Sequence, residues 1–188
     1  MHMLGYARTR LAVLLWAVLV TILMSRGPAL AADAAKIDRD ANAALALLNR
    51  TTPAAARLAP QAKAILIFPS MVKAGFIVGA QHGNGALRKG GKTVAYYRMN
   101  AASYGLQAGV QSFSYAMFLM TDEAVAYLDK SQGWEIGVGP SVVIVDAGMG
   151  KTLTTTTAKD DVYGFIFGQK GLMAGLGLQG SKITQIDP

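Results

Sequence analysis

Two glycine-rich segments carry letters that occur in nucleotide-binding motifs. Residues 175–180 match the pattern G-x-G-x-x-G, and residues 148–152 (GMGKT) look like the end of a phosphate-binding loop. A dinucleotide site needs a helix directly after the glycines and an acidic residue about 20 positions further on, but only eight residues follow Gly180. Val145 stands where the phosphate-binding loop needs its first glycine. We therefore interpret the first segment as glycines that leave one face of a strand bare, and the second as a hairpin turn.

Metal-binding and catalytic side chains are scarce. The chain has no cysteine and two histidines, His2 and His82. A thiolate metal site cannot form, and a Ser-His-Asp triad would have to use His82, which we expect in a turn far in sequence from any acidic cluster. Among the acids, Asp146 at the end of an apolar strand is the carboxylate that neither a helix start nor a turn explains. The composition argues against an enzyme, and we expect no metal and no cofactor.

Basic side chains give a stronger indication of a functional site than the acids and histidines do. Arg88, Lys89 and Lys92 crowd the tip of a predicted hairpin, and Lys36 and Arg39 lie on a predicted N-terminal helix. Two interpretations stay open, an ordinary solvated surface and a patch that contacts the head groups of anionic phospholipids. These five residues are our candidate head-group site. The apolar face of the helix is mostly alanine, so the helix alone should bind membranes weakly.

The N-terminal segment predicts export. Arg8 and Arg10 precede an apolar run over residues 11–24, which is shorter than the ~20 residues of a bilayer-spanning helix. The breaker Gly27-Pro28 and the small-x-small site that ends at Ala31 follow, so we expect residues 1–31 to be a cleaved signal peptide and the mature protein to be periplasmic or secreted. An uncleaved anchor is the alternative.

Cleavage near Ala31 changes the charge of the chain. It leaves 157 residues with 15 basic and 11 acidic side chains, a net charge of +4 instead of +7. The high isoelectric point thus comes largely from the targeting segment, and we do not expect nucleic-acid binding. The remaining length suits a single domain.

Periodicity predicts the helices that position the basic residues. Residues 32–60 have apolar residues at helical spacing, Thr52-Pro53 opens a second short helix, and Pro60 ends it. Thr121 begins a central helix that closes near Lys130. The apolar positions of the first helix are Ile37, Ala41, Ala44, Leu45 and Leu48.

From Ala64 onward the pattern changes to strands and turns. Turns are predicted at Gly83-Asn84-Gly85 and at Lys89-Gly90-Gly91-Lys92, and Pro69 is expected to stop the first strand. The predicted strands cover residues 64–68, 74–81, 86–88, 93–99, 104–120, 136–138, 141–147, 151–158, 162–167 and 172–183.

Alternation in two of these strands predicts that one face is buried. Tyr104, Leu106, Ala108 and Val110 alternate with glycine and glutamine, which is typical of a half-buried strand. The final strand repeats this pattern from Leu172. The predicted class is α+β: N-terminal helices packed on a large, mostly antiparallel, Gly-rich β-sheet, with one further central helix.

The order of the motifs from Ala64 to the end resembles the SYLF domain family, also known as the Ysc84-type actin-binding domain. The resemblance makes residues 32–188 a single SYLF-like domain, with a helical segment at 32–60 and a sheet-rich core at 64–188. The matching stretches are residues 64–69 (AILIFP), 73–79 (KAGFIVG), 83–87 (GNGAL), 103–111 (SYGLQAGVQ), 120–121 (MT) and 171–183 (GLMAGLGLQGSKI).

The resemblance implies a binding function. Eukaryotic members of the family bind phosphoinositide membranes, and some fungal members bind and bundle actin. Lipid binding there is associated with an N-terminal amphipathic helix and basic surface residues, and no catalytic residue is attributed to the family. The predicted export separates this chain from actin, so we do not expect an actin partner. We expect a non-enzymatic lipid-binding module that docks on anionic phospholipid membranes; the alternative is a cell-envelope interaction protein that binds a protein partner or itself.

Overall fold

The computed structural model describes residues 27–130, 134–135, 140–145, 153, 159–175 and 178–188. Residues 36–187 form one compact unit, which is described below by itself, and residues 1–35 with Pro188 form the other. The predicted signal peptide up to residue 26 lies outside the described residues, as do Asp146, the predicted turn at 148–152, the strand at 136–138 and nearly all of the strand at 151–158. None of the described helices combines the length and the hydropathy that a bilayer span requires.

Three α-helices and one short 3-10 turn are described. They are α2 (Gly27–Thr51), α3 (Pro53–Leu58), η1 (Ala59–Gln61) and α4 (Asp122–Lys130). The predicted inward face of α2 is confirmed, because Ile37, Ala41, Ala44 and Leu48 are buried. The predicted cap of α4 is also confirmed, since the Ala124 amide donates to Thr121 Oγ1 at 3.2 Å.

Helix α2 starts earlier than the sequence predicts. Gly27 and Pro28, interpreted above as a helix breaker, form its first residues. Proline is tolerated in the first turn of a helix because its missing N–H would have no intrahelical partner there. The predicted cleavage point at Ala31 therefore falls inside the N-terminal part of α2.

A six-stranded sheet forms the rest of the unit. Its strands are β1 (Ala64–Lys89), β2 (Lys92–Leu119), β3 (Trp134–Glu135), β4 (Val142–Ile144), β5 (Val162–Gly175) and β6 (Leu178–Ile186). Strand β2 pairs with β1 along one edge, while β5 and β6 follow one another along its other edge. Every pairing is antiparallel except that of β4 with β5, so the predicted α+β class with a mostly antiparallel sheet is confirmed.

Strand β1 is one long strand where the sequence predicts three short ones. The predicted turn at Gly83-Asn84-Gly85 is wrong, because these residues pair with β2, and His82 likewise lies in a strand. Pro69 does not stop the strand either: the register shifts between Phe68 and Met71, and pairing then continues. The predicted turn at Gly90-Gly91 is confirmed, with φ of 56° and 79°, the left-handed values that a two-residue hairpin turn requires.

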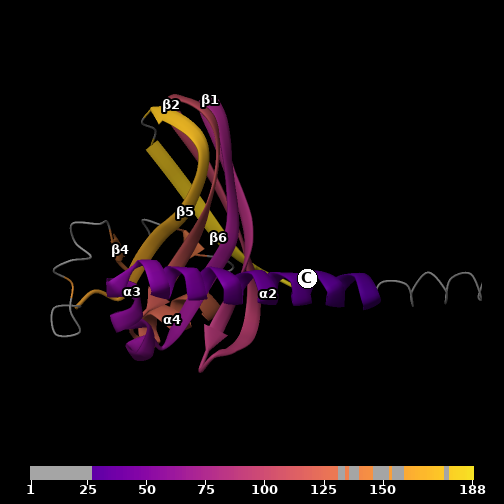
Figure 1. The fold of residues 1–188 in the computed structure, drawn as a ribbon, viewed down its shortest axis with the longest axis vertical. Coiled ribbons are helices and arrows are strands. Elements are labelled where there is room, and N and C mark those ends of the chain that lie inside the picture. Colours follow the sequence, from indigo (N-terminus) through magenta and orange to yellow (C-terminus); the bar gives the residue numbers. More distant parts are fainter. Residues whose placement is uncertain (1–26, 131–133, 136–139, 146–152, 154–158, 176–177) are drawn as a thin grey trace, which may run out of the picture. The chain divides into compact units, whose positions relative to one another are not determined.

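The long strands bend sharply at mid-length. In β1 the bend lies at Gly75–Gly79, where a side chain on Gly75 would begin 2.4 Å from the Cα atom of Gly79. The two halves of β1 then pack on each other, since a Cβ on Gly85 would lie 2.4 Å from the carbonyl oxygen of Ile67. Figure 1 shows the strands rising past α3 and α4 to this bend, near the labels β1 and β2.

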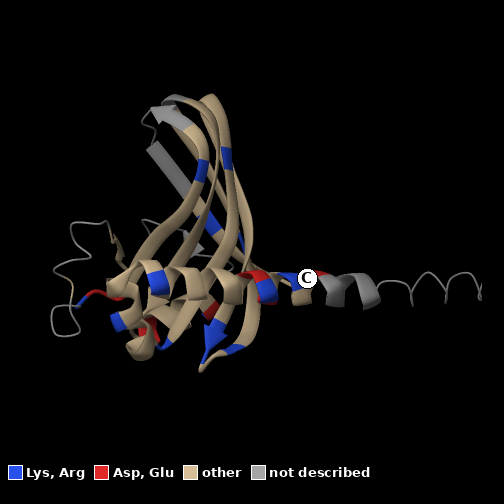
Figure 2. Cartoon of the chain, in the orientation of Figure 1, with Lys and Arg blue, Asp and Glu red and all other residues tan. Residues whose placement is uncertain are grey.

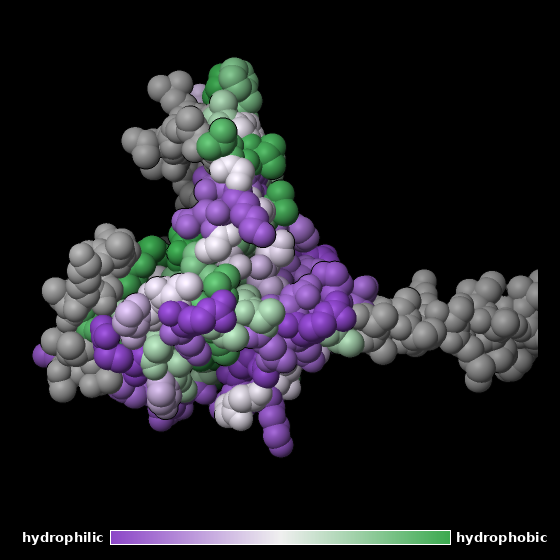
Figure 3. Space-filling view, in the orientation of Figure 1, coloured by the Kyte–Doolittle hydropathy of each residue, from purple (hydrophilic) through white to green (hydrophobic). Residues whose placement is uncertain are grey.

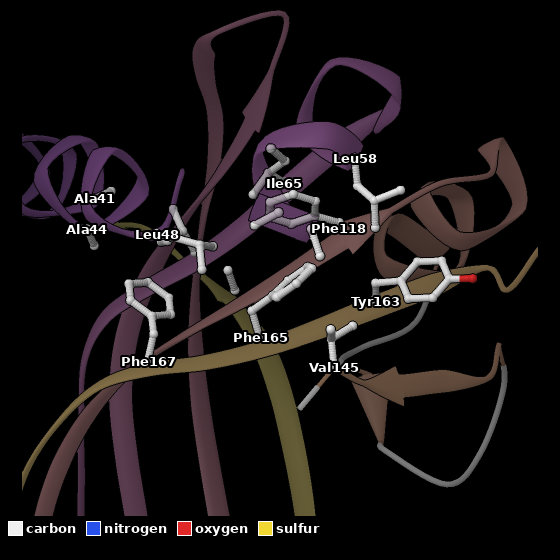
Figure 4. Packing of buried hydrophobic residues seen from close by; sticks show 14 of the residues in the cluster. Ala41, Ala44, Leu48, Leu58, Ile65, Phe118, Val145, Tyr163, Phe165 and Phe167 are labelled. Carbon is white, nitrogen blue, oxygen red and sulfur yellow. The ribbon is translucent and has the colours of Figure 1, made fainter. Parts of the chain in front are cut away.

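Two hydrophobic clusters hold the unit together. One joins α2 and α3 to the sheet, where Leu48 and Leu58 share a cluster with Phe118, Phe165 and Phe167 (Figure 4). The rings of Phe118 and Phe165 lie 4.9 Å apart, centre to centre. The other cluster lies between the folded halves of the sheet and α4 and includes Phe68, Met71, Tyr97, Met99 and Leu128.

Candidate functional site

The five candidate head-group residues lie at one end of the sheet. Arg88, Lys89 and Lys92 surround the β1–β2 turn, and the lysines at positions 89 and 92 are exposed. Arg88 is half-buried, and its Nη2 atom donates to the carbonyl oxygen of Gly91 at 2.5 Å.

Asp38 connects α2 to this end of the sheet. Its carboxylate accepts hydrogen bonds from Thr93 Oγ1 at 2.6 Å and from the Tyr96 hydroxyl at 3.0 Å. The contact brings Lys36 and Arg39, which flank Asp38 on α2, close to the basic turn.

Acidic partners offset the charge of the helix residues. Asp40 lies 2.7 Å from Lys36 Nζ and 3.6 Å from Arg39 Nε. The hydrogen bond from Lys36 is the main cause that lowers the pKa of the Asp40 carboxyl. Lys89 and Lys92 therefore present positive charge to solvent more directly than the α2 pair does.

Acidic residues are confined to the parts of the chain outside the four long strands. Strands β1, β2, β5 and β6 contain no aspartate or glutamate. Figure 2 shows Lys and Arg distributed along these strands, with acidic residues elsewhere in the unit. Within the described part of the chain, the ion pairs join Lys36 and Arg39 to Asp40 and Lys63 to Asp122, all outside these four strands. Their seven cations are Lys73, Arg88, Lys89, Lys92, Arg98, Lys170 and Lys182.

An open cavity of about 440 Å³ lies among strands β1, β2, β4, β5 and β6. Lys73 and Gln111, which face each other across β1 and β2, line it together with Gln81. Its apolar lining residues include Phe113 and Ile166. A cavity of this size that is lined by an ammonium group, amides and apolar side chains can hold part of an anionic amphiphile. The remaining lining residues are Met99, Tyr115, Ile144, Gln169 and Ser181.

The bend carries exposed apolar side chains that the sequence analysis missed. Phe76 is 75% exposed, Tyr104 is 68% exposed and Leu172 is 87% exposed. The prediction that Tyr104 and Val110 lie on a buried face is wrong, because alternation separates two faces of a strand but does not say which face is covered. The signal that could have found this feature is the run Phe76-Ile77-Val78 between two glycines, since turns are usually polar.

The described residues contain no group of three His, Asp or Glu side chains that could hold a metal ion. His82 lies exposed on β1, where its Nδ1 atom is 2.8 Å from Asn100 Oδ1. This cross-strand contact gives the imidazole a structural partner on the sheet surface.

Comparison with known proteins supports the resemblance found in the sequence. Residues 100–187 match the model of the family Ysc84, described as Las17-binding protein actin regulator. No curated protein matches the chain. The match covers most of β2, α4 and strands β3–β6, and its description names a binding protein rather than an enzyme. The match to residues 100–187 therefore agrees with the resemblance to the Ysc84 (SYLF) domain family that the sequence motifs indicate.

Proposed function

We propose that the protein is an exported, non-enzymatic module that binds anionic phospholipid membranes. The observation that carries this proposal is the composition of the four long strands, which hold seven Lys or Arg residues and no acid. Each basic residue close to an anionic membrane surface contributes about 1 kcal/mol of attraction. The family match to a binding protein agrees with a binding role.

The head-group contact is proposed at the β1–β2 turn. Arg88, Lys89 and Lys92 are its main residues, with Lys36 and Arg39 on α2 beside them. The turn itself is Gly90-Gly91, which has no apolar side chain to bury, so the neighbouring lysines can approach a membrane surface.

Export is proposed from the N-terminal pattern. Cleavage near Ala31 would remove only the first residues of α2. The buried positions from Ile37 to Leu48 all follow that point, so the packed part of the helix stays in the mature protein.

Vesicle co-sedimentation tests the proposal. The purified protein should bind vesicles in proportion to their phosphatidylglycerol content, and binding should weaken as salt screens the charges. Replacing Arg88, Lys89 and Lys92 by alanine should lower partitioning at low salt about a hundredfold, because three bases contribute about 3 kcal/mol.

A charge-matched control distinguishes the contribution of the turn residues to vesicle binding from the contribution of the net charge of the protein. Replacing Arg50, Lys130 and Lys159 by alanine removes the same charge from exposed positions outside the four strands. Equal binding by the two triple variants would reject the turn as the contact site. A wild-type protein that binds no vesicle of any composition would reject the lipid function in favour of a protein partner in the envelope.

A further inference from the structure

The bend in the sheet forms an apolar face that spans three strands. We define the apolar bend as Phe76, Ile77 and Val78 of β1, Tyr104 and Val110 of β2, and Leu172 of β5; all six are exposed. The strand register makes them neighbours, since Val110 pairs with Ala74 on one side and with Leu172 on the other, and Val78 pairs with Tyr104. Figure 3 shows hydrophobic side chains gathered at this end of the sheet, with hydrophilic ones directly below.

Backbone strain at the bend increases the exposure of its apolar side chains. Ile77 has a φ of 63° and lies where the pairing of β1 with β2 is irregular. A β-branched residue rarely adopts this left-handed conformation, because its Cβ crowds the backbone. The irregularity leaves three consecutive apolar side chains exposed, whereas a regular strand would turn the middle one to the other face. Strain of this kind often marks a functional position.

Polar and basic residues border the apolar bend on both sides along the strands. Two residues along the strands from the pair Val110 and Leu172, Ser112 pairs with Lys170. In the other direction Asn100 pairs with His82 and with Lys182, and Glu135 of β3 lies beside that lysine. The apolar bend is therefore bordered by polar residues in both directions along the strands, with Lys170 on one side and Lys182 on the other.

From this arrangement we propose that the apolar bend inserts into the interface of an anionic lipid bilayer. The proposal rests on the proposed membrane function, and it identifies the apolar bend as the part of the protein that moves from water into the bilayer. Lys170 then lies at the level of the head groups, and the aromatic rings of Phe76 and Tyr104 lie at the boundary of the acyl chains, a position that such side chains favour.

Charge distinguishes a bilayer from a second copy of this chain as the occupant. Two apolar bends placed face to face would bring the Lys170 side chains of both copies to the same interface, and the strands that form the bend, β1, β2 and β5, contain no acid to pair with them. Like charges across an interface oppose association. Anionic head groups supply the complementary charge, and the acyl chains accept the apolar side chains.

The salt dependence of vesicle binding distinguishes insertion of the apolar bend from contact through the basic turn. The turn lies thirteen residues from Phe76 along β1, at the opposite end of the sheet in Figure 1. Binding through the turn is electrostatic and should disappear near 1 M salt, where the screening length is about 3 Å. Binding through the apolar bend should persist, because the transfer of apolar surface from water does not depend on head-group charge.

The test compares a double variant with a matched control at high salt. Phe76→Ser with Leu172→Ser should weaken the salt-resistant binding to phosphatidylglycerol vesicles at least tenfold, because burying one large apolar side chain contributes about that factor. Val94→Ser is the control, since Val94 is 56% exposed on β2 outside the apolar bend. Both replaced positions of the double variant are exposed, so the fold should persist, which circular dichroism verifies.

A fluorescence measurement reports insertion directly. Near 1 M salt, where the contact through the basic turn is screened, Phe76→Trp should shift its emission to the blue on vesicle binding and should be quenched by brominated acyl chains, while Val94→Trp should show neither effect. Wild-type binding at low salt together with unchanged high-salt binding of the double variant would overturn insertion and leave the membrane function intact. No binding under any condition would overturn both. A dimer in sedimentation velocity that the double variant converts to a monomer would make the apolar bend a self-association surface instead.

Discussion

At the scale of single residues, Ile77 is a β-branched residue in a backbone conformation that such residues rarely adopt. It holds a left-handed backbone conformation that favours glycine, yet its side chain is 44% exposed and stabilises no core. A stability requirement alone would favour glycine here, so the isoleucine points to a role for its side chain in contact with something outside the protein.

Replacing Ile77 by glycine should separate stability from binding. The strain is worth about 1–2 kcal/mol, and glycine loses about 0.5–1 kcal/mol through its greater freedom in the unfolded chain. We expect the free energy of unfolding to stay equal or rise by up to about 1 kcal/mol in urea titration, while salt-resistant vesicle binding weakens. A variant that loses stability and keeps its binding would contradict the role given to this side chain.

Two buried tyrosines make stability depend on alkaline pH. Burial raises the pKa of Tyr97 to about 12, and the nearby Asp129 carboxylate adds to this shift. Burial also raises the pKa of Tyr115. Both pKa values lie above the ~10 of an unfolded chain, so the contribution of each tyrosine is complete below about pH 10 and falls as pH rises above it. The contribution of Tyr97 is lost as pH passes about 12. Urea titrations across this range should show falling stability, and Tyr97→Phe combined with Tyr115→Phe should flatten the curve.

At the scale of elements, the sequence patterns correctly predicted the features that depend on interactions between residues close in sequence. The inward face of α2, the cap of α4 and the turn at Gly90-Gly91 depend on residues close in sequence, and all three are confirmed. The glycines at positions 83 and 85 look like a turn, but they serve contacts with residues 12 to 18 positions earlier, which only the fold reveals. The apolar bend escaped prediction for the same reason, because alternation gives no sign of which face is covered.

Gly85→Ala tests the close packing of the two halves of β1. The new Cβ would lie 2.4 Å from the Ile67 carbonyl oxygen, so the backbone must shift. We expect a loss of about 1–3 kcal/mol in the free energy of unfolding, as for other overpacked cores. Gly90→Asn is the control, because a Cβ there meets nothing within 4 Å and asparagine tolerates the left-handed conformation. Equal stability of the two variants would show that the halves of β1 do not pack this closely.

At the scale of the whole molecule, function is divided along the strands. The half of the sheet that lies away from the bend packs against α2, α3 and α4 and holds most of the described core. The bend carries apolar residues without a partner among the described elements. The acids stay on the helices, the connections, β3 and the C-terminal end, which leaves the four long strands positively charged throughout. Membrane affinity and fold stability therefore draw on different residues, so each can be altered with little effect on the other.

The central position of β2 has a consequence for how the chain folds. Its partners are distant in sequence: Ala64 pairs with Leu119 across 55 residues, and Tyr96 pairs with Ile186 across 90. Contact order this high slows folding to the range of milliseconds to seconds. The hairpin around Gly90-Gly91 can close early, but one edge of β2 stays unpaired until residues 162–186, which follow it in the chain, have been made. During that interval the open edge exposes unpaired backbone groups to any other strand, so late arrival of the C-terminal strands is the step at which this protein is most prone to mispairing.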